Sequence, residues 1–300
     1  MTAVALAVDL GGTKVEAGLV DETGTVVPGS RFRQPTGSGI TPEKLHGALV
    51  QVVRSALSGE RDVRGAGVGS AGPVDRRTGA IAPVNMPGLR GMVLRDAVAD
   101  AVARAGFADL PVRLGHDGGC LALAESWVGA TRDAASSLAV VVSTGIGGGF
   151  VVDGRLVSGA SGNAGHLGQT HVGEGLTLEE VASGPSSVAW AREQGWNGAT
   201  GEELGAAAAA GDAVARVAIE RSARHVGRAL ADAATLVDLD VIAVGGGFSH
   251  VAADYVDLVG GALRDAAVLP YAAAAAVVPS GLRGDGPLVG AAALVLRPAR

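Results

Sequence analysis

The apolar positions of this chain fall mainly into short continuous runs that end at glycines or at polar turns. Such runs, rich in Val, Ala and Leu, predict buried strands. Strands are expected over 3–7, 15–20, 25–32, 63–69, 112–114, 138–142 and 241–244. Longer stretches with helical spacing predict helices over 41–57, 94–105, 120–128 and 212–236. The predicted elements thus alternate between strands and helices along much of the chain.

The first predicted strand ends in an acid and two glycines, Asp9, Gly11 and Gly12, followed by Thr13 and Lys14. Bare backbone N–H groups, a hydroxyl and an ammonium at one point form a phosphate cradle, and Asp9 is a candidate metal ligand beside it. The spacing is not that of the Walker loop, and a β-hairpin rather than a helix follows. The glycine pair alone could equally be a tight turn.

Two further glycine-rich segments follow buried strands. Thr144, Gly145, Gly147 and Gly148 lie between the strand 138–142 and a second predicted hairpin, which repeats the arrangement at the start of the chain. Such a repeat suggests two related halves. The third segment, Gly245–Gly247, could let the backbone lie flat against a ligand ring.

The composition indicates a folded chain in one large or two medium domains, since its 300 residues are 48% hydrophobic. A net charge of −6 argues against a nucleic-acid partner. No apolar run is long enough to cross a bilayer, so no membrane partner and a cytoplasmic location are expected. The single cysteine, Cys120, cannot form an internal disulfide or a cysteine-rich zinc site and is expected to pack a helix.

Asp117 is the candidate catalytic residue, a general base, because it lies at a predicted strand-to-helix junction. A carboxylate there can point into a cleft and act as a general base, although it could also simply cap the helix. The segment Gly67–Gly72 formally matches the dinucleotide-binding fingerprint. Pro73 and the polar turn after it leave no helix for that fingerprint to open, so dinucleotide binding is rejected.

Taken in order, these motifs resemble the ROK family of sugar kinases and repressors, within the actin, hexokinase and Hsp70 fold. The resemblance covers nearly the whole chain. It rests on Asp9–Lys14, Gly67–Asp75, Asn85–Gly91, Asp117, Thr144–Gly149, Gly162–Gly165 and Gly245–Gly247. It implies an α/β, ribonuclease H-like fold of two lobes with ATP and sugar in the cleft between them. The lobes are expected at 1–115 plus 287–300 and at 116–286.

The resemblance also implies a mechanism, in which Asp117 takes the proton of the 6-hydroxyl of a glucose-like hexose and that oxygen attacks the γ-phosphate of ATP. Asp9 would hold Mg²⁺ directly or through water. The residues implied for ATP are Asp9, Gly11, Gly12, Thr13, Lys14, Thr144, Gly145, Gly147, Gly148, Gly245, Gly246 and Gly247. Those implied for the sugar are Gly72, Asn85, His116, Asp117, His166, Gln169 and Glu179, with Glu180 in place of Glu179 if the alignment slips by one.

The chain departs from the family pattern after the sugar loop, residues 162–165. The family carries Glu-x-Gly-His and then a cysteine-rich zinc segment, whereas this chain has His166, Gln169 and no cysteines there. A structural zinc site is therefore not expected. His166 and His171 could form only a minor metal site, and a surface or sugar-facing role is the alternative.

The second departure is His116, where the family has Asn before its catalytic acid. This position and that of His166 are both implied along the C3 and C4 edge of the sugar. One interpretation is an amino-hexose substrate such as 3-amino-3-deoxyglucose (kanosamine) of antibiotic biosynthesis, since imidazoles can hydrogen-bond an amine. The alternative is a general glucokinase with neutral replacements, and a non-catalytic sugar sensor is a third possibility.

A DNA-binding repressor of the family is not expected, because the first phosphate loop begins at residue 9 and the chain is acidic. ROK enzymes are commonly dimers or tetramers, so the resemblance implies a homo-oligomer.

Overall fold

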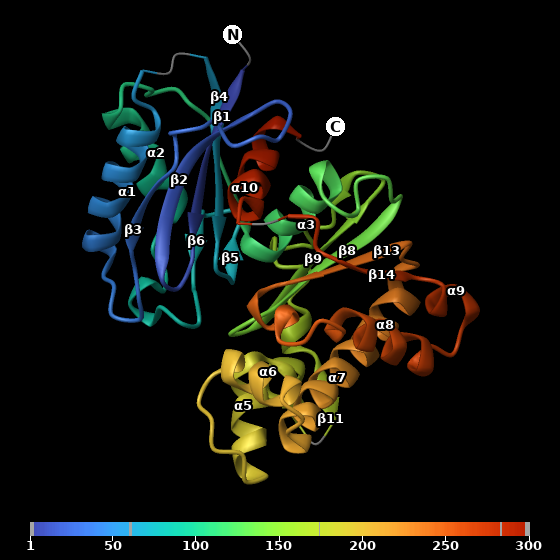
Figure 1. The fold of residues 1–300 in the computed structure, drawn as a ribbon. Coiled ribbons are helices and arrows are strands. Elements are labelled where there is room, and N and C mark those ends of the chain that lie inside the picture. The colour runs from blue at the N-terminus through green and yellow to red at the C-terminus, as the bar shows by residue number, and fades with distance from the viewer. Residues whose placement is uncertain (1–2, 60–61, 174, 283, 298–300) are drawn as a thin grey trace. The chain divides into compact units, whose positions relative to one another are not determined.

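The computed structural model describes residues 3–59, 62–173, 175–282 and 284–297. The chain divides into two compact units, a first unit of residues 1–129, 155–164 and 282–300 and a second unit of 130–154 and 165–281. The predicted lobe boundaries at 115/116 and 286/287 therefore differ from the observed division. The α/β class of the fold is as predicted, and each unit carries a mixed sheet with helices (Figure 1).

The first unit is built on a five-stranded sheet with the order β3-β2-β1-β4-β7. Its strands are β1 (Val4–Leu10), β2 (Lys14–Asp21), β3 (Phe32–Pro35), β4 (Val63–Ser70) and β7 (Val112–His116). Strand β1 runs antiparallel to β2 and parallel to β4, and β4 runs parallel to β7. The carboxyl ends of β1, β4 and β7 therefore lie at one edge of the sheet.

The predicted strand over 25–32 is wrong. Between 25 and 31 only Val26 forms a ladder bridge, to Val20, and β3 begins at Phe32, the last residue of the predicted strand. Pro28 has no N–H to donate and Gly29 adopts a φ of 77°, so this segment turns instead of continuing the hairpin.

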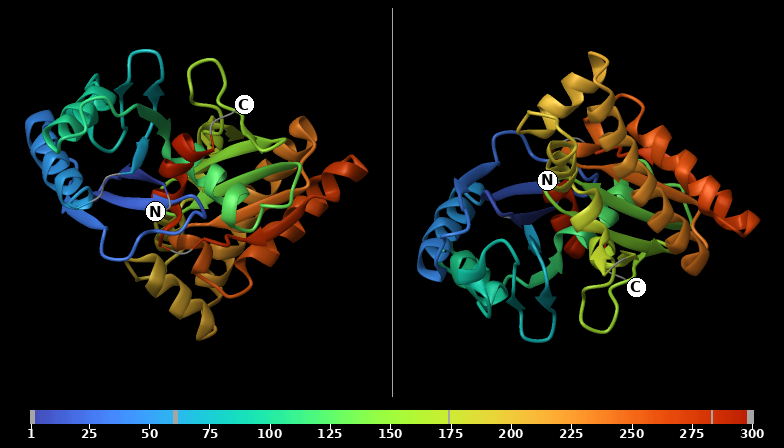
Figure 2. Two further views of the ribbon diagram at one scale, coloured as in Figure 1. Left: turned by 90° about the horizontal axis from the view of Figure 1, so that it is seen from above. Right: turned by 90° about the horizontal axis from the view of Figure 1, so that it is seen from below.

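The sheet of the first unit has unlike faces, and the alternation along β1 explains them. The four larger side chains Val4, Leu6, Val8 and Leu10 belong to the core on one face, whereas Ala5 and Ala7 belong to the core on the other. Helices α1 (Pro42–Ala56) and α2 (Leu94–Arg104) cover the first face and α10 (Gly286–Leu296) the second, as Figures 1 and 2 show.

Small residues let α10 pack closely in the first unit. A Cβ on Gly67 would collide with the Ala291 carbonyl, and one on Gly290 would collide with the Cys120 carbonyl of α3 (Asp117–Val128). This close packing of α3 against α10 places α3 in the first unit, although it was predicted to begin the second. The remaining elements of the unit are β5 (Val74–Asp75), β6 (Ala80–Ile81), η1 (Pro87–Leu89) and β10 (Arg155–Leu156).

The second unit repeats the strand arrangement of the first. Four of its strands lie in the order β9-β8-β13-β14, with β8 antiparallel to β9 and parallel to β13, like β1 with β2 and β4. They are β8 (Ser136–Val142), β9 (Ile146–Val152), β13 (Val241–Gly245) and β14 (Ala276–Pro279). The repeat that the glycine loops suggested is thus visible in the sheets.

The helices of the second unit surround the long α7, whose buried face is mainly alanine. Its helices are α4 (Leu178–Ala182), α5 (Gly184–Glu193), α6 (Gly201–Ala209), α7 (Ala213–Val237), α8 (Tyr255–Ala266) and α9 (Pro270–Ala273). Its shorter elements are η2 (Leu167–Gln169), β11 (His171–Gly173), β12 (Leu176–Thr177) and η3 (Gly247–His250). Across the described part of the chain, no helix combines the length and apolarity needed to span a bilayer.

Candidate active site

The predicted acid of the first loop, Asp9, is buried at the sheet edge where β1, β4 and β7 end. The ladder pairs Asp9 with Gly69 on β4 and Gly69 with Gly115 on β7, two residues before Asp117. Gly69 lies close to both side chains, since a Cβ there would be 3.6 Å from Asp9 Oδ1 and 3.3 Å from Cys120 Sγ. The fold of the first unit therefore brings the two predicted acids to the same sheet edge.

Asp117 is the first residue of α3, and the helix cap is its neighbour His116. The side chain of Asp117 is exposed, although residues 114–116 and 118–120 around it are buried. Its Oδ1 accepts the N–H of Gly118 at 2.7 Å. An exposed carboxylate on a buried framework can meet a substrate hydroxyl, so the general-base role predicted for Asp117 fits its position.

The charges at this edge act strongly on Asp9. Burial, then the negative charges of Asp117 and Glu16, raise the pKa of Asp9 to about 7, against the opposing effect of Lys14 and Arg31. A carboxyl whose pKa lies near 7 can lose its proton to solvent when a cation binds to it. Burial, then the negative charges of Asp117 and Asp9, raise the pKa of the Cys120 thiol, so Cys120 packs α3 as a neutral group.

Lys14, predicted to bind phosphate, has a partner inside the chain. Its Nζ lies 2.7 Å from Oε1 of the fully buried Glu16, which also accepts hydrogen bonds from Arg31 Nε at 3.1 Å and Nη2 at 3.0 Å. Burial raises the pKa of Glu16, but the hydrogen bonds from Arg31 and Lys14 outweigh it and the net pKa is lowered. The ammonium is thus fixed beside the loop, with its charge shared with Glu16.

The glycine loop itself is tight. The Gly11 N–H donates to the Lys14 carbonyl at 2.9 Å. This N–H was predicted to bind phosphate, but in the structure it is used within the loop. Gly12 faces the side-chain amide of Asn85, which a Cβ at position 12 would overlap. Asn85 and Thr13 are both exposed, and Gly72 is half-buried just after β4.

His116 does not have the free ring nitrogens that its predicted sugar contact requires. Nδ1 accepts the Gly119 N–H at 3.2 Å, and Nε2 lies 3.0 Å from the Ala164 carbonyl oxygen. The ring is 3% exposed. The prediction that His116 lies along the sugar as a hydrogen-bonding side chain is therefore corrected, because both of its nitrogens are used within the first unit.

In the second unit, Glu179 contacts the second glycine loop. Its Oε2 accepts the Ile146 N–H at 2.8 Å, and its Oε1 accepts Gln169 Nε2 at 3.3 Å. Gly145 leaves room for this carboxylate, since a Cβ there would lie 2.5 Å from Oε2. The alternative, Glu180, instead forms a capping box with Thr177 at the start of α4. Glu179, not Glu180, is therefore the acid that joins Gln169 at the loop.

The other predicted sugar residue of this unit, His166, lines a different cavity of about 600 Å³ with His171 and residues of α7. Among the residues that the structure describes, no three His, Cys, Asp or Glu side chains are grouped closely enough to hold a metal ion. The minor metal site considered for His166 and His171 thus has no third ligand of these kinds in the described chain.

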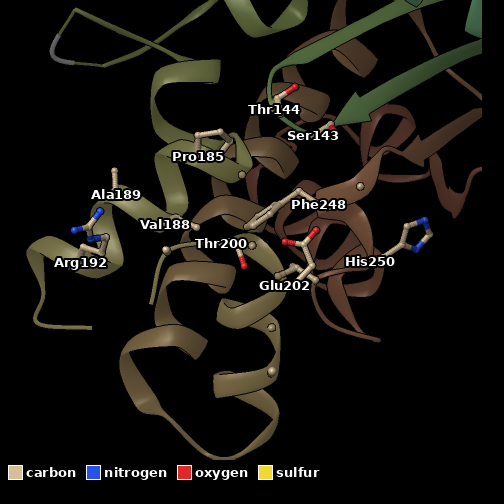
Figure 3. Close-up of a pocket in the computed structure, with 17 residues that line it drawn as sticks. Ser143, Thr144, Pro185, Val188, Ala189, Arg192, Thr200, Glu202, Phe248 and His250 are labelled. Carbon is tan, nitrogen blue, oxygen red and sulfur yellow. The ribbon is translucent and has the colours of Figure 1, made fainter. Parts of the chain in front are cut away.

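A larger cavity, of about 740 Å³, opens beside the second glycine loop. Figure 3 shows the Phe248 ring in the middle of it, with Ser143 and Thr144 on one side and Thr200 and Glu202 on the other. Its walls also include Pro185 and Val188 of α5. Apolar walls with hydroxyls at one end and charged groups at the rim suit a flat heterocycle that carries a phosphate chain.

The structure divides the predicted ATP residues of the second unit into two groups. Thr144 and Gly247 line the cavity, whereas Gly148, Gly245 and Gly246 allow close backbone packing. Gly246 has a φ of 97°, and a Cβ there would overlap the Val142 carbonyl. Gly145 is half-buried in the loop itself, and Gly147 is half-buried at the start of β9. The cavity residues that the sequence did not indicate include Pro185, Val188, Arg192, Thr200, Glu202, Phe248 and His250.

Comparison with known proteins identifies the family. The model of the ROK family matches residues 5–298. The chain is 33% identical over 300 residues to an N-acetylmannosamine kinase of Escherichia coli O7:K1, covering 97% of this chain and 98% of that protein. The structure is similar to a ROK hexokinase from Thermus thermophilus, with a TM-score of 0.83, 32% identity and 96% of both chains covered.

It is also similar to a ROK family glucokinase from Streptomyces griseus in complex with glucose and AMPPNP. The TM-score is 0.82 and the identity 30%, over 98% of this chain and 100% of that one. The motif order, the paired sheets and these similarities agree, and the chain belongs to the ROK family.

Proposed function

We propose that this chain is an ATP-dependent sugar kinase that phosphorylates the 6-hydroxyl of a hexose or an N-acetylhexosamine. The observation that carries the proposal is the exposed carboxylate of Asp117, held on a buried helix start at the same sheet edge as the buried Asp9. A sensor that only binds sugar needs no such base. The enzymatic names of the relatives support the same choice.

In the proposed reaction, Asp117 accepts the proton of the sugar hydroxyl as that oxygen bonds to the γ-phosphorus of ATP and the bond to the ADP oxygen breaks. Asp9 would hold Mg²⁺, directly or through water, and its raised pKa fits a carboxyl that exchanges a proton for a cation. The bound ion would neutralise charge on the phosphates. Lys14, fixed by Glu16, adds a positive charge beside the loop.

The nucleotide is assigned to the 740 Å³ cavity of the second unit, with the adenine against Phe248 and the phosphates toward Thr144. Gly247 tests this assignment, because a Cβ there meets only Ser143 Oγ, at 3.6 Å, and its φ lies outside the left-handed region. Gly247→Val therefore adds methyl groups to the cavity without backbone strain.

We expect Gly247→Val to raise the KM for ATP about tenfold and to leave the KM for sugar unchanged, since one misfitting group costs about 1–3 kcal/mol of binding. Initial rates at varied ATP and varied sugar check it. The matched control is Gly261→Val on α8, where a Cβ would contact nothing within 4 Å. An unchanged KM for ATP in Gly247→Val would place the nucleotide elsewhere.

The proposed sugar class rests on the relatives. We propose glucose or N-acetylmannosamine, which the names of a similar enzyme and of a similar structure give for those proteins. The more specific proposal, an amino-hexose such as 3-amino-3-deoxyglucose, rested on His116 and His166 together. The geometry of His116 removes half of that basis, so this sugar is kept as a competitor in the test.

The proposal is tested by an ADP-release assay with MgATP and six sugars: glucose, mannose, glucosamine, N-acetylglucosamine, N-acetylmannosamine and 3-amino-3-deoxyglucose. Turnover of glucose or N-acetylmannosamine above the others supports it. A preference for the 3-amino sugar would instead establish the amino-hexose kinase. Sugar binding without ADP release from any of the six would support the sensor.

Glu179 gives a second prediction. In Glu179→Gln the side-chain oxygen can still accept the Ile146 N–H, but the amide nitrogen cannot accept from Gln169. If the Glu179 carboxylate contacts the sugar as proposed, the variant loses one charged hydrogen bond to it, and we expect the KM for the sugar to rise about tenfold with the KM for ATP unchanged. Glu180→Gln is the control, because it alters only the cap of α4. Equal effects of the two variants on the KM for sugar would contradict the assignment.

A further inference from the structure

The buried ring of His116 lies directly before the exposed Asp117, and its two hydrogen bonds fix its chemical form. The Gly119 amide can only donate, so Nδ1, 3.2 Å away, must be unprotonated. The Ala164 carbonyl can only accept, so Nε2, 3.0 Å away, must carry the proton. The ring is therefore neutral, in the tautomer with its hydrogen on Nε2.

The two bonds join two segments that matter for the reaction. The bond at Nδ1 caps α3, the helix that begins with Asp117. The bond at Nε2 holds Ala164 in the sugar loop, and Ala164 is the last residue of the first unit before the chain enters the second at Gly165. His116 thus ties the helix of the base to the end of this loop segment.

The backbone around Ala164 has little freedom of its own. The side chain of the preceding Asn163 is held at both ends of its amide, accepting the Val74 N–H at 2.8 Å and donating to the Val74 carbonyl at 2.7 Å. The following Gly165 adopts a φ of 109°, and a Cβ there would overlap the Gly148 carbonyl. The Ala164 carbonyl can therefore act as a fixed anchor for His116.

Resting on the proposed kinase function, we propose that His116 is a positioning residue that sets Asp117 relative to the sugar loop and does not itself contact the sugar. The bond from Nε2 to Ala164 does the positioning, and the bond at Nδ1 stabilises the helix start. It follows that His116 affects the turnover of every sugar alike and leaves the choice among sugars to other side chains.

Two amide variants separate the two bonds. Gln at 116 places an amide nitrogen near the position of Nε2 and keeps the donor to Ala164. Asn places an amide oxygen near Nδ1, keeps the cap of Gly119 and is too short to reach Ala164. We expect His116→Asn to lower kcat about 10–100-fold, because a displaced base loses rate steeply, and His116→Gln to stay within about threefold of the wild type.

The readout that distinguishes positioning from contact is the ratio of kcat/KM for glucose to that for N-acetylmannosamine. We expect this ratio to stay within about twofold of the wild type in both variants. A changed ratio would mean that His116 contacts the substrate, and an unchanged kcat in His116→Asn would mean that the Ala164 bond positions nothing. His46→Gln is the control, since His46 bonds Asp100 at 2.7 Å on the helical face of the same unit and should not change kcat.

A measurement on the wild-type protein stands even if the variants fail to fold. Long-range ¹H–¹⁵N spectra of the histidine rings report which nitrogen carries hydrogen, and the His116 signals are assigned by their loss in His116→Gln or from backbone-linked spectra. We expect the Nε2–H tautomer, and an Nδ1–H ring or a charged ring would overturn the proposal. If that tautomer is found but no sugar of the panel is phosphorylated, the proposed function fails and the catalytic role of His116 fails with it, while the hydrogen-bonding assignment stands.

Discussion

Asp117→Asn is expected to lower kcat about 10³-fold while ATP binding stays intact. Asn has the shape of Asp but cannot accept the proton of the sugar hydroxyl, and a general base contributes about 10²–10⁴-fold to the rate of a reaction of this kind. Because the loss is in kcat, raising the concentration of sugar or of ATP should not restore the rate. ADP release at high concentrations of both substrates, with ATP affinity measured by calorimetry, checks the two halves of this expectation.

The exposure of Asp117 makes this test clean. Its side chain lies on the surface, so the substitution leaves no cavity in the core, and loss of its charge removes part of the repulsion that raises the pKa of Asp9. We therefore expect Asp117→Asn to fold like the wild type. Asp109→Asn is the matched control, an exposed acid of the same unit on the connection between α2 and β7. If Asp117→Asn kept a tenth or more of the wild-type kcat, the general-base assignment would be wrong.

The sequence predicted much of the framework because the framework follows from local patterns. A buried strand reads as a continuous apolar run, and a strand that ends against a ligand or a tight turn reads as glycines after that run. These two signals occur together at Asp9–Gly12 and again at Val142–Gly145. The repeated sheet order of the two units is the structural counterpart of that repetition.

The partners of individual side chains could not be predicted in the same way. Lys14 was expected to bind phosphate, but in the structure it pairs with Glu16, which also binds Arg31 just before β3. For His116, the decisive partner is Ala164, 48 residues later in the chain. Spacing along the sequence contains no information on such contacts, because they depend on how the loops return to the sheet edge.

The residues that line the nucleotide cavity could also be predicted only in part. Its sequence signals were the glycines and Thr144, and of these Thr144 and Gly247 line the cavity. Its specific walls come from Phe248 and from side chains of α5 and α6, such as Arg192 and Glu202. Single polar residues on amphipathic helices look like ordinary solvent-facing positions, so no pattern in the sequence distinguishes them.

Asp9→Asn should stabilise the protein without ligands and at the same time remove its activity. The pKa of Asp9 is about 7 in the folded chain, against a value of 3.8 for an unperturbed aspartate. Below pH 3.8 the group is protonated in both states and costs nothing. As pH rises from 3.8 to 7 the unfolded chain releases the proton and the folded chain keeps it, so the wild type loses stability across that window, and above pH 7 the cost is constant.

The size of this effect follows from the shift of about three pH units, which corresponds to about 4 kcal/mol in full and about 3 kcal/mol between pH 5 and pH 8. Urea unfolding of the wild type and of Asp9→Asn at pH 5, 6, 7 and 8, without Mg²⁺ or nucleotide, measures it. The stability advantage of Asp9→Asn should grow up to pH 7 and then level off. An advantage that does not grow with pH would mean that Asp9 is ionised at no cost in the folded chain. The free energy that ionised Asp9 costs in the folded chain also explains why it suits a cation, because a bound Mg²⁺ would offset the charge of this buried carboxylate. Mg²⁺ should therefore stabilise the wild type but not Asp9→Asn.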